Sequence, residues 1–268
     1  MIPVLTIAGS DSSGGAGIQA DLKTFAALGT YGMSCICALT AQNTKGVSMV
    51  VNTPVEMVKA QLDAIYDDIP PKAVKTGMLS TPDIVETVAD FLSAHKQPLV
   101  VDPVMVATSG AVLLEKAAIE TYKKKLIPLS TVITPNIPET EVLTGMKITS
   151  QKDMKEAAEK LMDLGPSAVL VKGGHLVEDA LDILYDGKEF HIFQGKKWDT
   201  MNTHGTGCTL SSAIAASLAK GMTLTEAVGE GKKYMNGAIE RAVHDSVGHG
   251  HGPVHHFWLY GDSWGRMK

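Results

Sequence analysis

The sequence predicts an α/β fold in which a doubly wound, mostly parallel sheet carries helices on both faces and a small hairpin at one edge. Short apolar runs alternate with segments of helical periodicity along most of the chain. The 268 residues are 44% hydrophobic but only 5% aromatic, which favours a large core of aliphatic and small side chains. Because no repeat or linker-like stretch divides the chain, we expect a single domain over 1–268.

The elements follow from these runs in order. Strands are expected where short apolar runs occur, at 4–8, 33–39, 73–76, 99–101, 132–134 and 168–171. Helices are expected at 18–26, 54–66, from 82 onward, and at 151–164, 207–219 and 223–242. One hairpin is expected at 43–53 around Lys45-Gly46. A second, formed by 181–185 and 190–193 around Asp186-Gly187, is expected at the sheet edge.

Composition excludes several kinds of partner. The formal net charge is -5, and no run of Lys or Arg is long enough to indicate nucleic-acid binding. No apolar run reaches the roughly 18 residues that a membrane-spanning helix needs. The three cysteines do not form a disulfide framework, and we expect Cys35 and Cys37 to be buried core thiols on one face of a strand. We therefore expect a soluble, cytoplasmic protein that binds a small molecule.

The segment 203–209, THGTGCT, predicts a loop that leads into the N-terminus of a buried helix. The first N–H groups of a helix have no partner within it and carry the positive end of its dipole, so a glycine loop there can hold an anion such as phosphate. Cys208 lies at the same point, where its thiol is expected to ionise more easily than in an open chain. The alternative is a glycine-rich turn that only starts a core helix.

Polar residues follow several predicted strands, and in a doubly wound sheet ligands bind beyond the strand C-termini. Those residues are Gly9, Asp11, Gln42, Gly77, Met78, Asp102, Asn136, Glu139 and Lys172. Asp102 and Glu139 offer the one or two carboxylates that Mg²⁺ combines with phosphate oxygens and water. Pro135 and Pro138 are expected to prevent a regular helix around Asn136. The alternatives are an Asx turn at Asp102 and a first-turn helix acid at Glu139.

Two nucleotide-binding motifs fit only in part. The stretch 15–20, GAGIQA, matches the G-x-G-x-x-G/A pattern of dinucleotide-binding folds, so a dehydrogenase or a nucleotide-binding sensor remains an alternative. However, residues 34–42 contain no Asp or Glu to hold the ribose. A Walker A loop also fails, because Gly15 stands where its lysine should be.

Four segments together resemble a known family: AGSDSSGGAGIQAD at 8–21, TAQN at 40–43, DPVM at 102–105 and THGTGCT at 203–209. They are similar to the bacterial hydroxymethylpyrimidine/phosphomethylpyrimidine kinases of thiamine biosynthesis, in the ribokinase-like superfamily. The resemblance extends through GHGHGP at 248–253. It implies a ribokinase-like kinase that uses ATP and Mg²⁺ to phosphorylate first the hydroxymethyl group of the pyrimidine and then the monophosphate. It also implies a homodimer.

The resemblance further implies roles for individual residues. Gly205 and Gly207, with the N–H of Cys208, correspond to an anion hole for the γ-phosphoryl group, and Cys208 stands where many relatives have a catalytic Asp. Asp102 and Glu139 correspond to the magnesium site. Contacts to the nucleotide phosphates are implied for Lys172, Asn136, Glu139 and Thr206. For Lys172 the alternative is a strand-end lysine that only extends toward solvent.

The pyrimidine pocket implied by the resemblance contains Gln42, Asp21, Gly9, Met78 and Val106. The Gln42 amide presents a donor beside an acceptor, which is complementary to the ring nitrogen and exocyclic amine of an aminopyrimidine. Asp21 could instead be an exposed helix acid. Related pyridoxal kinases share much of this pattern, and a pyridoxal kinase activity, alone or together with the pyrimidine kinase activity, is the nearer alternative. The histidines of 249–256 indicate either a metal site or a flap near the nucleotide.

Overall fold

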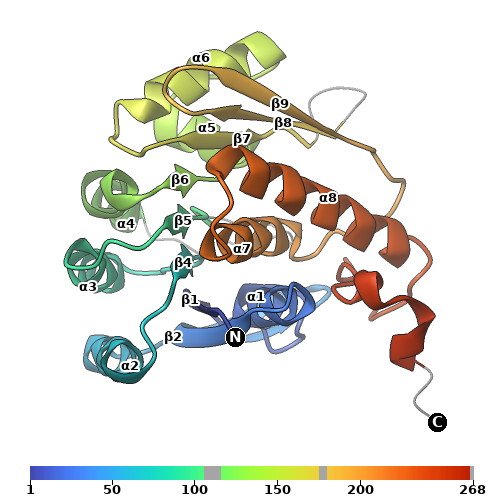
Figure 1. The fold of residues 1–268 in the computed structure, drawn as a ribbon, viewed down its shortest axis with the longest axis horizontal. Helices are drawn as coiled ribbons and strands as arrows, with labels where there is room; N and C mark the ends of the chain where they lie inside the picture. The colour runs from blue at the N-terminus through green and yellow to red at the C-terminus, as the bar shows by residue number, and fades with distance from the viewer. Residues whose placement is uncertain (106–115, 175–179, 266–268) are drawn as a thin grey trace.

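The computed structural model describes residues 1–105, 116–174 and 180–265, and within them nine strands form one sheet (Figure 1). The strands are β1 (Pro3–Gly9), β2 (Tyr31–Asn43), β3 (Gly46–Asn52), β4 (Ala73–Thr76), β5 (Leu99–Val101), β6 (Val132–Ile133), β7 (Val169–Lys172), β8 (Ala180–Tyr185) and β9 (Phe190–Gly195). Their order across the sheet is β3-β2-β1-β4-β5-β6-β7-β8-β9. The pairs from β2 to β7 are parallel, whereas β3, β8 and β9 add antiparallel edges. The predicted fold class and edge hairpin are confirmed.

Helices cover both faces of this sheet (Figure 1). They are α1 (Gly17–Ala27), α2 (Val55–Asp68), α3 (Pro82–Ser93), α4 (Lys116–Thr121), α5 (Ile137–Thr144), α6 (Gln151–Met162), α7 (Thr206–Ala219) and α8 (Leu224–Ala242). Alternate residues of each central strand enter two separate cores. Leu5 and Ile7 of β1 join the core under α2, α3 and α6, whereas Val4 joins the core under α1, α7 and α8.

The winding of the chain reverses beside β1. After β1 the chain forms β2 on one side of it, and it then returns to place β4 on the other side. The connections that leave β1 and β4 therefore run in opposite directions and open a crevice at their C-terminal ends. Thr81 begins α3 there, because its side chain accepts a hydrogen bond from the Ile84 N–H and Pro82 has no N–H to lose.

The second strand is longer than the sequence predicts. The apolar run predicts 33–39, but β2 extends over Tyr31–Asn43 and itself forms the first arm of the hairpin with β3. The turn between them is at Thr44-Lys45, one residue before the expected position. The polar end of β2 forms a strand because its backbone pairs with β3, and local hydrophobicity does not report such pairing.

The prediction that two prolines prevent a helix near Asn136 is wrong. Asn136 is the N-cap of α5, and Pro138 lies in the first turn of that helix. The first N–H groups of a helix have no carbonyl to bind within it, so a proline there costs no hydrogen bond. Cys35 and Cys37 are fully buried, as expected. Within the described ranges no helix combines the length and the apolarity needed to cross a membrane.

Candidate active site

A cavity of about 160 Å³ lies at the C-terminal ends of the parallel strands, where the loop after β1 meets the start of α7. It is lined by nearly all the site residues that the sequence predicts. Those residues are Gly9, Gln42, Met78, Asp102, Asn136, Glu139, Lys172, Gly205, Thr206, Gly207 and Cys208. They come from seven separate parts of the chain. Gly205 and Asp102 therefore share one cavity, as a phosphotransferase site requires.

The start of α7 is shaped by two glycines that touch. Gly205 is the N-cap of α7 with φ 81°, a left-handed conformation that favours glycine. A Cβ on Gly205 would lie 1.9 Å from the Gly15 carbonyl oxygen, so the loop after β1 can approach only because this residue has no side chain. No side chain caps the helix start. The Thr206 N–H donates to the Thr203 carbonyl at 3.3 Å, whereas the N–H groups of Gly207 and Cys208 remain free to bind an anion in the cavity.

Asp102 and Lys172 form an ion pair that faces this helix start. Lys172 Nζ lies 2.9 Å from Asp102 Oδ1, and the two side chains are 13% and 2% exposed. Thr134 Oγ1 donates to the same oxygen at 3.2 Å. Burial raises the pKa of Asp102, but Lys172 and the nearby Lys75 lower it more, so its pKa lies below its ordinary value. Asp102 is therefore a carboxylate at neutral pH.

Glu139 faces the cavity from the first turn of α5 and is 5% exposed. Its side chain accepts the Asn136 N–H at 2.8 Å, and the Asn136 side chain accepts the Glu139 N–H at 2.9 Å, which makes a capping box. Burial raises the pKa of Glu139 to about 7; the Lys172 charge opposes this rise, whereas Asp102 adds to it. Glu139 is thus both a helix cap and a carboxyl group that changes charge near neutral pH.

The expectation that Cys208 ionises easily is wrong. The thiol lines the cavity at the start of α7 and is half-buried. Burial raises its pKa to about 11, and the positive charge of Lys75 offsets only part of this rise. The loss of hydration on burial raises the pKa of the thiol more than the helix dipole lowers it. Cys208 therefore carries its proton at neutral pH.

Asp21 does not line the cavity, contrary to the prediction of a substrate contact. Its carboxylate is fully buried and lies 2.9 Å from Lys75 Nζ. It also accepts hydrogen bonds at 2.6 Å from both Thr6 Oγ1 and Ser212 Oγ. Helical spacing turned Asp21 inward, toward β1, β4 and α7, where the sheet and helices meet. Val106, the remaining predicted pocket residue, lies outside the described residues.

Two residues that line the cavity, Asp11 and His204, received no functional role from the sequence. His204 Nε2 lies 2.8 Å from Asp11 Oδ2, and both residues line the cavity. Gln42 stands beside them, with its Nε2 3.5 Å from His204 Nε2. Asp11 and His204 are 193 residues apart in the chain, and no local pattern links them. The sequence marks Asp11 only as a residue beyond a strand end, and it marks His204 only by its place in a glycine-rich segment.

The histidine-containing segment after α8 lies against the same region. The His204 N–H donates to the Gly252 carbonyl at 3.0 Å, and the His251 N–H donates to the Thr44 carbonyl at 2.9 Å. Residues 249–253 are thus attached to both the 203–209 loop and the β2–β3 turn. Among the residues that the structure describes, no group of three or more His, Cys, Asp or Glu side chains could hold a metal ion. The metal-site alternative for this segment is therefore not supported within those ranges.

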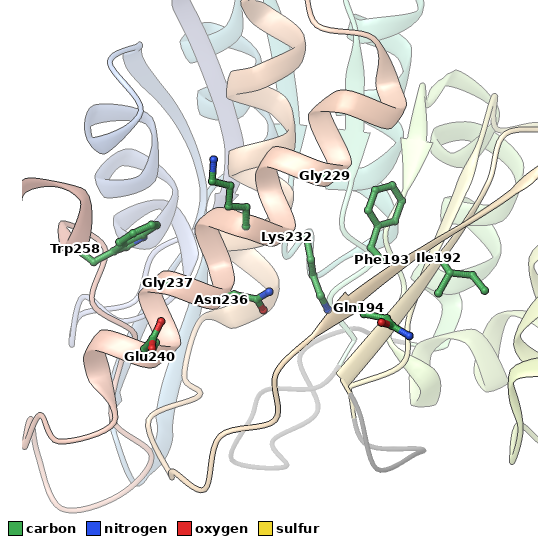
Figure 2. A pocket seen from close by; sticks show the side chains of 10 residues that line it. Ile192, Phe193, Gln194, Gly229, Lys232, Asn236, Gly237, Glu240 and Trp258 are labelled. Atoms are coloured by element: carbon green, nitrogen blue, oxygen red, sulfur yellow. The ribbon is translucent and has the colours of Figure 1, made fainter.

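A larger cavity, of about 500 Å³, lies between β9 and α8 (Figure 2). It is lined by Ile192, Phe193, Gln194, Gly229, Lys232, Lys233, Asn236, Gly237, Glu240 and Trp258. None of the site residues predicted from the sequence lines it. Lys232 is held by Asp182 at 2.7 Å, and Asp182 also accepts the Gly173 N–H at 3.1 Å. The site residues predicted from the sequence therefore line the smaller of the two cavities.

Comparison with known proteins agrees with this geometry. The family model of phosphomethylpyrimidine kinase matches residues 11–255. The hydroxymethylpyrimidine/phosphomethylpyrimidine kinase of Streptomyces coelicolor is 50% identical over 259 residues, which cover 97% of this chain and 96% of that protein. The crystal structure of phosphomethylpyrimidine kinase from Clostridium difficile 630 is 52% identical, with a TM-score of 0.79 over 88% of this chain and 98% of that one. Bacillus subtilis pyridoxal kinase, solved with ADP, is 39% identical, with a TM-score of 0.89 over 97% of this chain and 99% of that one. This chain therefore belongs to the phosphomethylpyrimidine kinase family.

Proposed function

We propose that this kinase transfers the γ-phosphoryl group of ATP to 4-amino-5-hydroxymethyl-2-methylpyrimidine and then to the resulting monophosphate, as a step of thiamine biosynthesis. One observation supports this most strongly. The uncapped N-terminus of α7 shares a cavity of about 160 Å³ with the Asp102–Lys172 pair and with the Gln42 amide. An anion site, a charged phosphate-binding pair and a group complementary to an aminopyrimidine edge thus surround one space.

In the first transfer, the substrate hydroxyl oxygen bonds to the γ-phosphorus while the bond from that phosphorus to the β,γ-bridging oxygen breaks, releasing ADP. The hydroxyl proton passes to an oxygen of the transferred phosphoryl group. The N–H groups of Gly205, Gly207 and Cys208 face the oxygens on which negative charge accumulates. Lys172, whose Nζ would lie 3.3 Å from a Cβ on Gly207, contacts the phosphates beside the helix start, and Thr206 and Asn136 add polar contacts. Because a loose transition state needs little help from a base, the protonated Cys208 thiol orients the hydroxyl and does not take its proton at the start.

The residues present fit a Mg²⁺ ion. Asp102 and Glu139 provide two carboxyl groups that line the same cavity, and Mg²⁺ in phosphoryl-transfer sites is bound by one or two carboxylates together with phosphate oxygens and water. When bound, the ion supplies positive charge that neutralises the phosphate oxygens. The raised pKa of Glu139, about 7, means that this residue offers a full negative charge only above neutral pH in the free protein.

Gln42 determines the substrate in this proposal. Its side chain lines the cavity with Gly9 and Met78, and its amide can pair with both the ring nitrogen and the amine of the pyrimidine. A pyridoxal kinase activity is the second candidate, because the chain is so similar in structure to Bacillus subtilis pyridoxal kinase. Pyridoxal has no aminopyrimidine edge, which favours the pyrimidine.

The experiment is to supply purified protein with ATP and Mg²⁺ and either the pyrimidine or pyridoxal, and to follow ADP release together with ³¹P NMR of the product. We expect mono- and diphosphate only with the pyrimidine. Turnover of pyridoxal alone would support the second candidate, and hydride transfer to NAD without ATP use would exclude a kinase.

The Gln42→Leu variant tests the substrate assignment. The loss of two hydrogen bonds to a buried edge is expected to lower kcat/KM for the pyrimidine by roughly 10- to 100-fold, while the KM for ATP stays within about twofold. Equal losses for the pyrimidine and for ATP would contradict the role of Gln42.

We further propose a cytoplasmic homodimer of one kinase domain spanning 1–268. The single sheet supports one domain, and the three free cysteines support a reducing compartment. An exposed apolar face on the β2–β3 hairpin supports self-association. Its residues Leu39, Met49 and Val51 are 56%, 63% and 56% exposed, and they lie on one side of the hairpin.

A further inference from the structure

A buried pair formed by an aspartate and a histidine lies beside Gln42, the residue proposed to recognise the substrate. Asp11 is 1% exposed and His204 is 6% exposed, and their side chains meet at 2.8 Å. The mechanism above gives neither of them a role. His204 also packs closely on the loop after β1, because a Cβ on Gly15 would lie 2.4 Å from His204 Cδ2. The imidazole is thus held in place from two sides.

The hydrogen-bond partners of Asp11 determine where the imidazole hydrogen lies. Asp11 accepts from the Ser13 N–H and Oγ–H at 2.9 and 2.7 Å, and from the N–H groups of Gly15 and Ala16 at 3.1 and 2.8 Å. Burial raises the pKa of Asp11, but these bonds and the one from His204 outweigh it and lower the pKa to about 2. Asp11 is therefore an acceptor only, and His204 Nε2 must carry the hydrogen.

Matching hydrogen-bond donors with acceptors in the same way determines the orientation of the Gln42 amide. Thr40 Oγ1 donates its single hydrogen to the Ser10 carbonyl at 2.8 Å, so toward Gln42, 3.2 Å away, it can only accept. His204 Nε2, 3.5 Å from the other end of the amide, carries its single hydrogen toward Asp11 and has no lone pair left, so it cannot accept from an amide N–H. In the structure Gln42 Oε1 faces Thr40 and Nε2 faces His204, which places oxygen against oxygen and N–H against N–H. Turned by 180°, the amide gives Thr40 Oγ1 a donor and sets its oxygen beside the positive N–H edge of His204.

We propose that Asp11 and His204 are positioning residues that hold the Gln42 amide with its oxygen toward His204 and its nitrogen toward Thr40, and so determine which way round the aminopyrimidine ring binds. This inference rests on the proposed pyrimidine substrate. The ring nitrogen accepts from the amide nitrogen and therefore lies on the Thr40 side. The exocyclic amine donates to the amide oxygen and lies on the His204 side.

The orientation of the Gln42 amide also positions the hydroxymethyl group that reacts. In the substrate the amine is flanked on one side by the ring nitrogen and on the other by the carbon that carries the hydroxymethyl group. Placing the amine near His204 therefore directs the hydroxymethyl group beyond it, toward Gly205 and the start of α7. A reversed amide would reverse the ring and direct the hydroxymethyl group toward Thr40, away from the phosphoryl group. His204 thus connects substrate recognition with the anion site that follows it in the chain.

The test is a double-mutant cycle between His204→Met and Gln42→Leu, with kcat and KM measured for the pyrimidine and for ATP. In the otherwise unchanged protein, His204→Met is expected to lower kcat/KM for the pyrimidine by roughly 10- to 100-fold. In the Gln42→Leu background it should add less than about twofold, because the amide through which it acts is gone. His204→Gln keeps an N–H donor near the position of Nε2, and we expect it to recover most of the activity.

A substrate analogue provides a second measurement that a merely structural role would not change. The unchanged protein is expected to prefer the aminopyrimidine over 5-hydroxymethyl-2-methylpyrimidine, which lacks the amine, and His204→Met should reduce this preference. Asp11→Asn is the second variant, to be used if His204→Met does not fold. It keeps one acceptor oxygen for Ser13, replaces the oxygen that Gly15, Ala16 and His204 share with an amide nitrogen, and lets the imidazole change tautomer, so the same non-additivity with Gln42→Leu is expected. His244→Met, at an exposed histidine outside both cavities, is the matched control and should change neither constant.

The outcomes separate this inference from the proposed function. If the unchanged protein does not phosphorylate the aminopyrimidine, the proposed function fails, and the positioning role fails with it. If the unchanged protein is active but His204→Met causes the same fold-loss in both backgrounds, His204 does not act through Gln42 and only the positioning role is overturned. An unchanged preference for the amine in a folded His204→Met protein would overturn it as well.

Discussion

Cys208 illustrates how a single residue's surroundings decide its chemistry. It lies at a helix start, which favours a thiolate, yet burial raises its pKa to about 11. The balance is decided by desolvation, since the favourable Lys75 charge reduces the shift without reversing it. At neutral pH the group in the cavity is therefore a neutral thiol, which donates a hydrogen bond weakly and does not serve as a ready base.

The first prediction concerns Cys208→Ser and Cys208→Ala. Because the thiol acts in its protonated form, a hydroxyl should orient the substrate nearly as well, and Cys208→Ser should keep kcat within about tenfold. Cys208→Ala should lose roughly 100-fold, which is the range expected when a reacting group is no longer held in position. The measurement is kcat for the pyrimidine, with the KM for ATP as the control. An ionisation near pH 7 that disappears from the pH profile of Cys208→Ser would show that a thiolate takes part.

The second prediction concerns pH and Glu139. Because burial raises the folded-state pKa of Glu139 from 4.5 to about 7, the protein binds this proton more tightly when folded. The contribution of Glu139 to stability is therefore fully present below about pH 4.5 and is lost as pH rises through about 7. In protein free of Mg²⁺ and nucleotide, we expect the unfolding free energy to fall by no more than about 3 kcal/mol over this window. Urea unfolding from pH 5 to pH 8 measures it.

Glu139→Gln isolates this charge from the helix cap. A glutamine still closes a capping box, so α5 should keep its first turn, while the pH-dependent loss should disappear. Glu230→Gln, at a carboxylate with a 53% exposed side chain, is the matched control and should leave the pH dependence as it is. The same pH dependence in the unchanged protein and in Glu139→Gln would contradict the assignment.

At the scale of elements, the buried Asp21–Lys75 pair connects four of them. Asp21 belongs to α1 and Lys75 to β4, and the carboxylate also binds Thr6 of β1 and Ser212 of α7. Both charged side chains are fully buried. Removing one charge would leave the other without a counter-charge in a region that water does not reach, which is more costly than losing an exposed ion pair. The pair therefore holds α7, and with it the anion site, against the sheet.

The third prediction follows from this network. Asp21→Asn is expected to lower the unfolding free energy by about 3–5 kcal/mol, whereas Asp21→Asn combined with Lys75→Met should cost clearly less than the sum of the two single changes. Urea unfolding measures both. The control is Asp63→Asn, which breaks the exposed Lys59–Asp63 pair of 3.0 Å and should cost less than about 1 kcal/mol. If the loss of unfolding free energy in the double variant equals the sum of the two single losses, the two charges do not depend on each other.

At the scale of the whole molecule, the two edges of the sheet differ. The edge at β3 presents Met49 and Val51, 63% and 56% exposed, next to Leu39 of β2. On the opposite edge, β9 alternates half-buried and exposed residues, of which Ile192 is 47% exposed. An exposed apolar face on an edge strand favours pairing with another chain. This difference supports the β2–β3 hairpin as the contact of the proposed homodimer.

The fourth prediction is that Met49→Lys combined with Val51→Lys converts the protein to a monomer. Two buried charges would oppose an apolar contact by several kcal/mol, enough to lower association by more than 100-fold. Light scattering after size-exclusion chromatography measures the mass of each form. Ile192→Lys, on the far edge, is the matched control and should remain dimeric. If the unchanged protein is a monomer, the homodimer proposal is wrong.

The alternation of strands and helices could be predicted from the sequence, because apolar periodicity is a local property that sterics and burial impose on each segment. It also marked most of the cavity residues, since residues at the C-termini of parallel strands must meet at one edge of the sheet. The remaining features could not be predicted before the folded arrangement was known. The full length of β2, the inward direction of Asp21, the proton on Cys208 and the contact of Asp11 with His204 all depend on groups distant in the chain. Pairing, desolvation and hydrogen bonding arise only when those groups are brought together.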